Sequence, residues 1–302
     1  MTLKNSGVLF VSGTGNATKF LLAQEAFIEG YKNSGVWSAL EGGPEHEENE
    51  IACAVRECYE ESLGVVMNKF ELHKVLQEAT TRRYRLNVAG NGGTAVSFVL
   101  FVVRIPPDDS IPALFDRKLR KVKATIDKVS RFNKLTNLMM HKNLPTVGRT
   151  CMDILFLDLF HAHANQHDPT HMWLHYNGVQ NGVAEQRILG LSFESTNDTI
   201  MFAQMVNLWN EIKNEVESMQ GLIDPVLEDK FIVSYQCRAC FLEKRQLRWF
   251  STMDVVASIN PNRRSVTNMR YSFAVLLSLM LDKCLLGTEG CQPEKTYAEY
   301  SR

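Results

Sequence analysis

The sequence predicts an α+β protein, and three stretches within its first 105 residues carry that prediction. "GVLFVS" (7–12) and "TAVSFVLFVVRI" (94–105) are rich in β-branched and aromatic residues, which favours strands. Between them, "EIACAVRECYEESL" (50–63) has apolar residues at positions 51, 54, 55, 58 and 63, which form one face of an amphipathic helix. Strands that flank a helix of this kind are typical of a mixed α+β domain.

The other elements of this first part follow from the turn residues between apolar runs. "GTGN" and "NSG" are turn signals, and Gly64 is a natural stop for the helix that starts at Glu50. The expected elements are strands at 19–26, 69–79 and 82–90, a segment at 36–40 that leads into a glycine- and glutamate-rich loop, and a tight turn at 90–93.

The pattern changes after residue 105, where "IPPDDSIP" forms a break. Helices are expected over 117–134, 151–164, 199–219 and 265–285, and strands over 231–243 and 247–251. The charge is uneven here: residues 116–149 contain ten Lys or Arg and two Asp, whereas the whole 302-residue chain has a formal net charge of −1. The basic segment must therefore be balanced by an acidic remainder.

Cysteine usage and apolar runs indicate the compartment. The seven cysteines are scattered and odd in number, and the one CxxC pair, Cys237 and Cys240, lacks a second pair, so neither a disulfide framework nor a zinc site is expected. The apolar run at the N-terminus is too short to form the core of a signal peptide. The apolar run "FAVLLSLML" near the end has only about half the length that is needed to span a membrane. We therefore expect a soluble cytoplasmic protein with no membrane partner.

The candidate site is the cluster of charged residues on the helix expected at 50–63. Glu57, Glu60 and Glu61 are three or four residues apart, so they project to one side, where like charges cost stability unless a cation lies between them. Carboxylate oxygens suit Mg²⁺ or Mn²⁺, and Arg56 can bind a neighbouring carboxylate. The alternative is a solvated acidic helix face.

The context of these charges resembles the Nudix box, G-x5-E-x7-R-E-U-x-E-E-x-G-U with U an aliphatic residue. Gly42 is followed after five residues by Glu48, and after seven more by Arg56 and Glu57; Cys58 stands at the U position, followed by Glu60 and Glu61. The chain departs from the pattern in two ways. Two residues, Ser62 and Leu63, precede Gly64 instead of one, and the loop from Gly43 to Glu48 is one residue shorter than usual.

The resemblance implies an α/β/α sandwich around a mixed sheet, with a largely helical insertion. The corresponding organisation is a first part of the Nudix domain at 1–105 with its box at 42–64, a basic, mostly helical insertion at 106–230, the final strands and helix at 231–290, and a tail at 291–302. The implied activity is metal-dependent hydrolysis of a nucleoside diphosphate linked to another group, X. Glu57, Glu60 and Glu61 would hold the metal, and Arg56 would orient a glutamate.

The late segment resembles the mRNA-decapping branch of the same family, viral or eukaryotic. Glu243 stands six residues before Trp249–Phe250, where those members carry a catalytic glutamate, so Glu243 or Glu57 is the candidate general base. The alternative for Glu243 is an ordinary pair with Lys244 or Arg245.

The basic segment suggests which X is attached. Because phosphate neutralisation dominates nucleic-acid affinity, a cationic helix over 117–134 favours an RNA substrate, with Phe132 as a stacking group. The alternative is a solvated basic face. The candidate substrate contacts are Gly42 and Gly43 of the loop and Arg117, Lys118, Arg120, Lys121 and Lys123 of the basic segment; Arg82, Arg83, Arg85, Arg263 and Arg264 are weaker candidates for phosphate contacts.

A run of histidines between 161 and 175 includes pairs four residues apart, a spacing that can share a metal on a helix. No other ligand completes a site, so a surface or packing role is favoured.

Three functions remain open from the sequence. The first is hydrolysis of the mRNA cap, the second is hydrolysis of a nucleotide sugar, a dinucleoside polyphosphate or an oxidised nucleotide, and the third is an inactive Nudix domain that binds RNA.

Overall fold

The structure is a computed structural model, and it describes residues 2–30, 33–89, 95–141, 159–164, 167–180, 183–217, 225–229, 232–235, 243–259 and 268–285. The chain divides into two compact units: Met1–Leu119 with Arg238–Arg302, and Arg120–Cys237. The boundary falls inside one continuous helix, α3 (Ile111–His141). Within the described parts, no helix is long and apolar enough to cross a bilayer.

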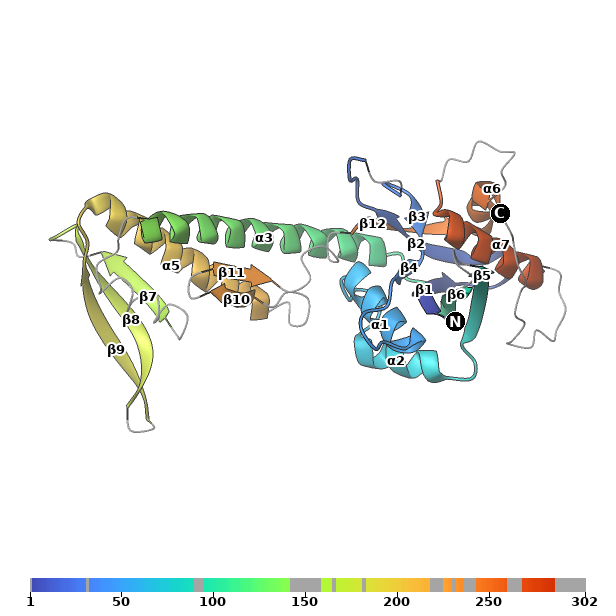
Figure 1. Cartoon of the computed structure of the whole chain (residues 1–302), viewed down its shortest axis with the longest axis horizontal. Helices are drawn as coiled ribbons and strands as arrows, with labels where there is room; N and C mark the ends of the chain where they lie inside the picture. The colour runs from blue at the N-terminus through green and yellow to red at the C-terminus, as the bar shows by residue number, and fades with distance from the viewer. Residues whose placement is uncertain are drawn as a thin grey trace. The chain divides into compact units, whose positions relative to one another are not determined.

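The first unit is built on a mixed seven-stranded sheet (Figure 1). Its path is β12 (Lys244–Ser251), β2 (Lys19–Glu25), β1 (Thr2–Ser12), β6 (Ala95–Arg104) and β5 (Arg82–Ala89). Two short strands, β3 (Trp37–Ser38) and β4 (Leu40–Gly42), pair with β2 and β1. The β1–β6 pair is parallel and the other pairs are antiparallel.

Helices lie on both sides of this sheet (Figure 1). One side carries α1 (Glu50–Glu61), which packs on β1 and β4, and α2 (Lys69–Gln77). The other carries α6 (Thr252–Ile259) and α7 (Tyr271–Leu285), whose apolar side chains form one core with Leu9, Phe20 and Leu100 of the sheet. The α+β class expected from the sequence, with helices on both sides of a mixed sheet, is confirmed.

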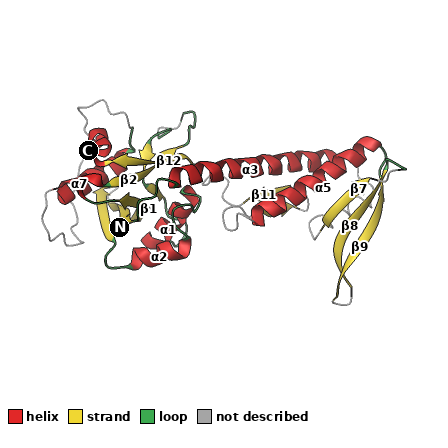
Figure 2. Cartoon of the chain, turned by 180° about the vertical axis from the view of Figure 1, so that it is seen from behind, coloured by secondary structure: helices red, strands yellow, loops and turns green. Residues whose placement is uncertain are grey.

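In its described residues, the second unit combines the later part of α3 and helix α5 (Thr196–Glu217) with small sheets (Figure 2). The later part of α3 packs on α5 through Val129, Phe132 and Trp209. A three-stranded sheet comprises β7 (Leu159–Ala164), β8 (His171–Gln180) and β9 (Val183–Ser192), and a hairpin comprises β10 (Pro225–Asp229) and β11 (Ile232–Tyr235). The region 106–230, expected to be a mostly helical insertion, therefore contains more strand than the sequence indicated.

Two predicted elements are wrong. Residues 69–79 are not a strand, because the Asn68 side chain accepts a hydrogen bond from Glu71 N at 2.9 Å and caps α2, which then buries Leu72 and Leu76 four residues apart. The end of the helix expected at 151–164 is strand β7, which pairs with β8; residues 151–158 lie outside the described residues.

The end of α1 also differs from expectation. Leu63, not Gly64, is the first residue after the cap in the left-handed region, at φ 54°. Its N–H donates to Glu60 O at 3.2 Å, and Gly64 N–H donates to Tyr59 O at 2.9 Å, which is the Schellman arrangement that usually places glycine at the first position. Leu63 is fully buried, so burial of its side chain offsets the backbone strain.

Candidate active site

The candidate site forms where α1 meets the loop after β4. Asn49 caps α1 by accepting from Ala52 N at 2.9 Å, which fixes where the helix starts and therefore which residues face the loop. A Cβ on residue 42 would lie 2.2 Å from Glu57 Cδ. Gly42 is therefore needed to admit the Glu57 carboxylate against the loop backbone.

Arg56 is the centre of an ionic cluster. Its Nε and Nη2 donate to the two carboxylate oxygens of Glu48 at 2.8 and 2.9 Å, and Nη2 also donates to Gly43 O at 2.8 Å. Its Nη1 donates to Glu57 Oε1 at 2.9 Å and Glu60 Oε2 at 3.2 Å. One guanidinium thus ties the loop to α1 and holds two carboxylates side by side, in line with the orienting role expected for Arg56.

The charge of this cluster is unbalanced, since four carboxylates lie within salt-bridge distance of one guanidinium: those of Glu45, Glu48, Glu57 and Glu60. Burial raises the pKa of Glu57 to about 7; Arg56 opposes that rise, and the charges of Glu60 and Glu243 add to it. By contrast, the hydrogen bond from Arg56 lowers the pKa of Glu48. Glu57 is therefore the carboxyl of this cluster that is suited to exchange a proton near neutral pH.

Glu243 lies at the start of β12, exposed, and close enough to Glu57 to affect its pKa. Its backbone carbonyl accepts from Ala26 N at 2.6 Å, which fixes this residue to the end of β2. Of the pair that follows it, Phe250 is buried edge-on against Trp37, and Trp249 Nε1 donates to Asp108 O at 2.9 Å.

Glu61 is held differently from Glu57 and Glu60. Its Oε2 accepts from Glu41 N at 2.7 Å, and its Oε1 pairs with Lys244 Nζ at 2.9 Å. Lys244 is 1% exposed and also pairs with Glu25, which Arg270 contacts in turn. No local pattern in the sequence indicates this buried network, because its members are separated by up to 245 residues.

A divalent cation fits part of the predicted ligand set. Glu57 and Glu60 offer two adjacent hard carboxylates with excess negative charge, which suits Mg²⁺ or Mn²⁺. Both oxygens of Glu61, however, are engaged by protein donors. Across the described ranges, no three His, Cys, Asp or Glu side chains converge on a ready-made metal site.

The predicted basic contacts lie along α3. Its buried residues recur at three- and four-residue intervals, and Arg117, Arg120, Lys121 and Lys123 are exposed, with Lys118 half-buried. Phe132 is fully buried against Trp209, with ring centroids 5.3 Å apart, so its predicted role as a stacking group is wrong.

The other predicted candidates separate into three cases. Arg83 and Arg85 pair with Glu50, while Arg82 lines a cavity described below. His161 and His175 are opposite each other on β7 and β8, so the histidines do not share a helix. The two cysteines of the CxxC pair, Arg263, Arg264 and the 291–302 tail lie outside the described residues.

Comparison with known proteins gives a family match for the first part of the chain. Residues 2–139, a little under half of the chain, match the sequence model of the NUDIX domain. No curated protein matches the chain.

Three solved structures show limited likeness. An Ap4A hydrolase from C. elegans in a binary complex is 21% identical, with 35% of this chain and 68% of that chain covered, at a TM-score of 0.25. The Nudix hydrolase RenU from M. smegmatis is 21% identical, with 35% of this chain and 62% of that chain covered, at a TM-score of 0.25. The NUDIX domain of Shewanella oneidensis NrtR, complexed with ADP ribose, is 12% identical, with 36% of this chain and 63% of that chain covered, at a TM-score of 0.24.

Proposed function

We propose that the chain, whose residues 2–139 match the NUDIX domain, hydrolyses phosphoric anhydride bonds and cleaves a nucleoside diphosphate linked to a further group X, with capped mRNA as the substrate. The observation that carries the proposal is the cluster in which Arg56 holds Glu57 and Glu60 together beside the glycine loop, with the pKa of Glu57 raised to about 7 by burial.

The roles of the side chains follow from their contacts. Glu57 accepts the proton of the attacking water, since its raised pKa suits a base working near neutral pH. Arg56 is a positioning residue, and Glu48 fixes Arg56 through its two-pronged contact. Glu57 and Glu60 would hold Mg²⁺ or Mn²⁺, which when bound neutralises the diphosphate and lowers the pKa of water.

Glu61 takes a different role from the one expected of a simple ligand. It accepts from Glu41 N beside Gly42 and pairs with Lys244, so it fixes the loop relative to α1. The double change Glu60→Gln with Glu61→Gln would also remove a carboxylate that pairs with the buried Lys244. A loss of turnover in that variant could then come either from a lost metal ligand or from a destabilised fold. Glu60→Gln alone is therefore the cleaner variant.

Two features support RNA as the group X. Glu243 lies near Glu57, at the spacing before Trp249–Phe250 that resembles decapping members. The exposed cations of α3 form a basic face on a helix whose opposite side is apolar, and such a face suits a phosphate backbone.

The substrate is tested with a panel in Mn²⁺: cap-labelled RNA, free cap dinucleotide, a nucleotide sugar and a dinucleoside polyphosphate. We expect release of methylated GDP from RNA and little turnover of the free cap. Turnover of only the small substrates would assign the second function, and RNA binding without turnover of any substrate would assign the inactive module.

Two variants with matched controls test the site and the basic face. Glu57→Gln is expected to lower kcat at least about 100-fold, whereas Glu71→Gln, an exposed glutamate on α2, changes little. Arg120→Glu is expected to raise KM for RNA and reduce the salt dependence by about one phosphate contact. Lys74→Glu, with the same charge change on exposed α2, is its control.

A further inference from the structure

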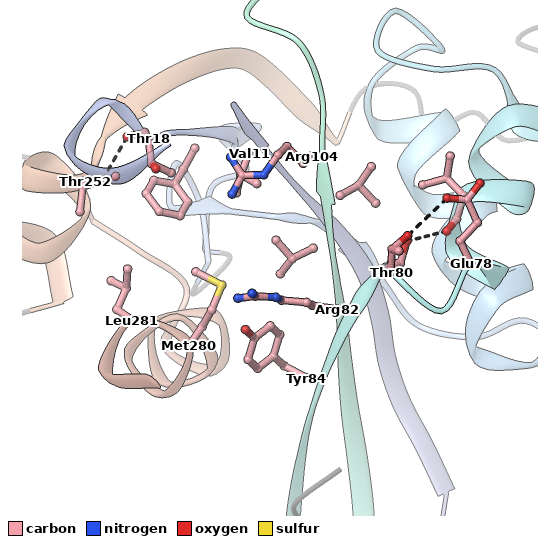
Figure 3. Close-up of a pocket in the computed structure, with 16 residues that line it drawn as sticks. Val11, Thr18, Glu78, Thr80, Arg82, Tyr84, Arg104, Thr252, Met280 and Leu281 are labelled. Atoms are coloured by element: carbon pink, nitrogen blue, oxygen red, sulfur yellow. Dashed lines mark hydrogen bonds between the residues drawn. The ribbon is translucent and has the colours of Figure 1, made fainter. Parts of the chain in front are cut away.

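A second cavity opens in the Nudix-containing unit, away from the carboxylates of α1. It has a volume of about 730 Å³, within the range of about 300 to 1,000 Å³ that is usual for small-molecule sites. Its walls come from β1, the turn that follows β1, β2, β5, β6, the end of α2 with the turn after it, α6 and α7 (Figure 3).

The position of this cavity separates it from the candidate active site. Val11 of β1 lines the cavity and belongs to the core formed with α7. Gly42 pairs with Ser6 of the same strand, and α1 packs on the other side of the sheet. Five residues of strand correspond to roughly 16 Å, so the two sites lie toward different ends of β1.

The cavity is positively charged. Among the described residues that line it, Arg82 and Arg104 carry positive charge and Glu78 carries negative charge. Arg82 is opposite Val102 in the β5–β6 ladder, so Arg104 is its diagonal neighbour on the same face, about 7 to 8 Å away at Cα. Because both side chains line the same cavity, an anion held between the two guanidinium groups would be attracted to both.

The contacts of Arg104 leave it oriented for such an anion. Its guanidinium donates to the backbone oxygen of Gly13, and no described carboxylate pairs with it. Glu78, the acidic residue of the cavity, contacts Thr80 Oγ1 at 3.5 Å instead (Figure 3).

The rest of the lining suits an apolar ring with hydroxyl groups. Phe20, Tyr84 and Met280 provide aromatic and thioether surface, and Tyr84 and Met280 lie beside Arg82 (Figure 3). Thr18, Thr80 and Thr252 add hydroxyl groups around the opening. Cationic, aromatic and hydroxyl groups in one cavity match a phosphate, a base and a sugar.

We propose that this cavity binds a nucleoside phosphate at a site separate from the one that performs hydrolysis. Arg82 and Arg104 contact the phosphate, and Tyr84 and Met280 contact the base. This proposal does not depend on the identity of X.

The test is calorimetric titration of the full chain with a nucleoside 5′-monophosphate in EDTA, where a metal-dependent catalytic site would not contribute. The expected result is one binding event that Arg82→Met and Arg104→Met each weaken at least tenfold. Arg83→Met, the next residue of β5 on the opposite face, is the matched control and should bind as the unchanged protein does. Hydrolysis should stay within about twofold in Arg104→Met.

Separate probes decide the ligand class. The nucleoside without phosphate should not bind, and inorganic phosphate should bind at least tenfold more weakly than the nucleotide. Equal binding of phosphate and nucleotide, binding of RNA oligonucleotides alone, or nucleotide binding unaffected by Arg82→Met and Arg104→Met would each overturn the proposal. Circular dichroism of each variant verifies that a loss of binding is not a loss of folding.

Discussion

Replacing Lys244 with methionine tests whether the buried network holds the first unit together. Lys244 is 1% exposed, and its ammonium contacts Glu25, Glu61 and Ser38. Lys244→Met keeps the apolar stem and removes the charge. Glu25 retains Arg270, but Glu61 is left with only the Glu41 N–H among its described partners.

The magnitude follows from the cost of an uncompensated buried carboxylate. Removing one partner of a buried ion pair typically costs about 3 to 5 kcal/mol, and the total stability of a domain is about 5 to 15 kcal/mol. Lys244→Met should therefore consume a large part of the free energy of unfolding. Adding Glu61→Gln removes the stranded charge and should recover about 2 kcal/mol or more.

The assay is urea-induced unfolding, followed by far-UV circular dichroism and by hydrogen exchange of peptides covering β4, where the Glu41 amide bonds to Glu61. Arg245→Met is the matched control, because Arg245 is the next cation of β12 but is exposed, with Gln24 and the Phe27 ring as its contacts. It should cost no more than about 1 kcal/mol. A loss below about 1 kcal/mol for Lys244→Met, or a further loss on adding Glu61→Gln, would refute this account.

Three further outcomes are expected. In metal-free protein, burial raises the pKa of Glu57 from 4.5 to about 7, so its contribution to stability is complete below pH 4.5 and is lost as the pH rises through 7. Unfolding curves should show a loss of about 3 kcal/mol over that window relative to Glu57→Gln. Leu63→Ala should lower the free energy of unfolding by about 2 to 4 kcal/mol, and Leu63→Gly should be about 1 kcal/mol more stable than Leu63→Ala, because φ at this position is positive. Phe132→Ala should destabilise the second unit by about 3 to 5 kcal/mol in thermal unfolding and leave RNA affinity unchanged in the folded protein.

Local spacing made the candidate site predictable. Glu57, Glu60 and Arg56 lie within one helical turn, so their shared face follows from helix geometry alone. The strand pattern of 94–105 was equally local, because a run of β-branched and aromatic residues of that length has few alternatives. These parts of the sequence therefore indicated both the fold class and the position of the acidic cluster.

Short apolar runs were harder to assign. The apolar residues of "KFELHKVLQEA" fit both the two-residue period of a strand and the four-residue spacing of a helix, as in Leu72 and Leu76. The hydrogen bond that Asn68 accepts as the helix cap favours the helix. In β7 and β8, His161 and His175 are paired by sheet register, which local spacing does not contain.

The contacts that complete the first unit come from the far end of the chain. The NUDIX match ends at residue 139, yet β12 supplies an edge strand to β2, and Lys244 and Arg270 supply the cations that face Glu25 and Glu61. A fragment that ended at 139 would lack these cations and also the strand that pairs with β2, and either carboxylate that stayed buried would have lost its cationic partners. The placement of Glu25 and Glu61 therefore depends on residues that lie beyond the end of the NUDIX match, whereas Arg56 holds Glu57 and Glu60 from within it.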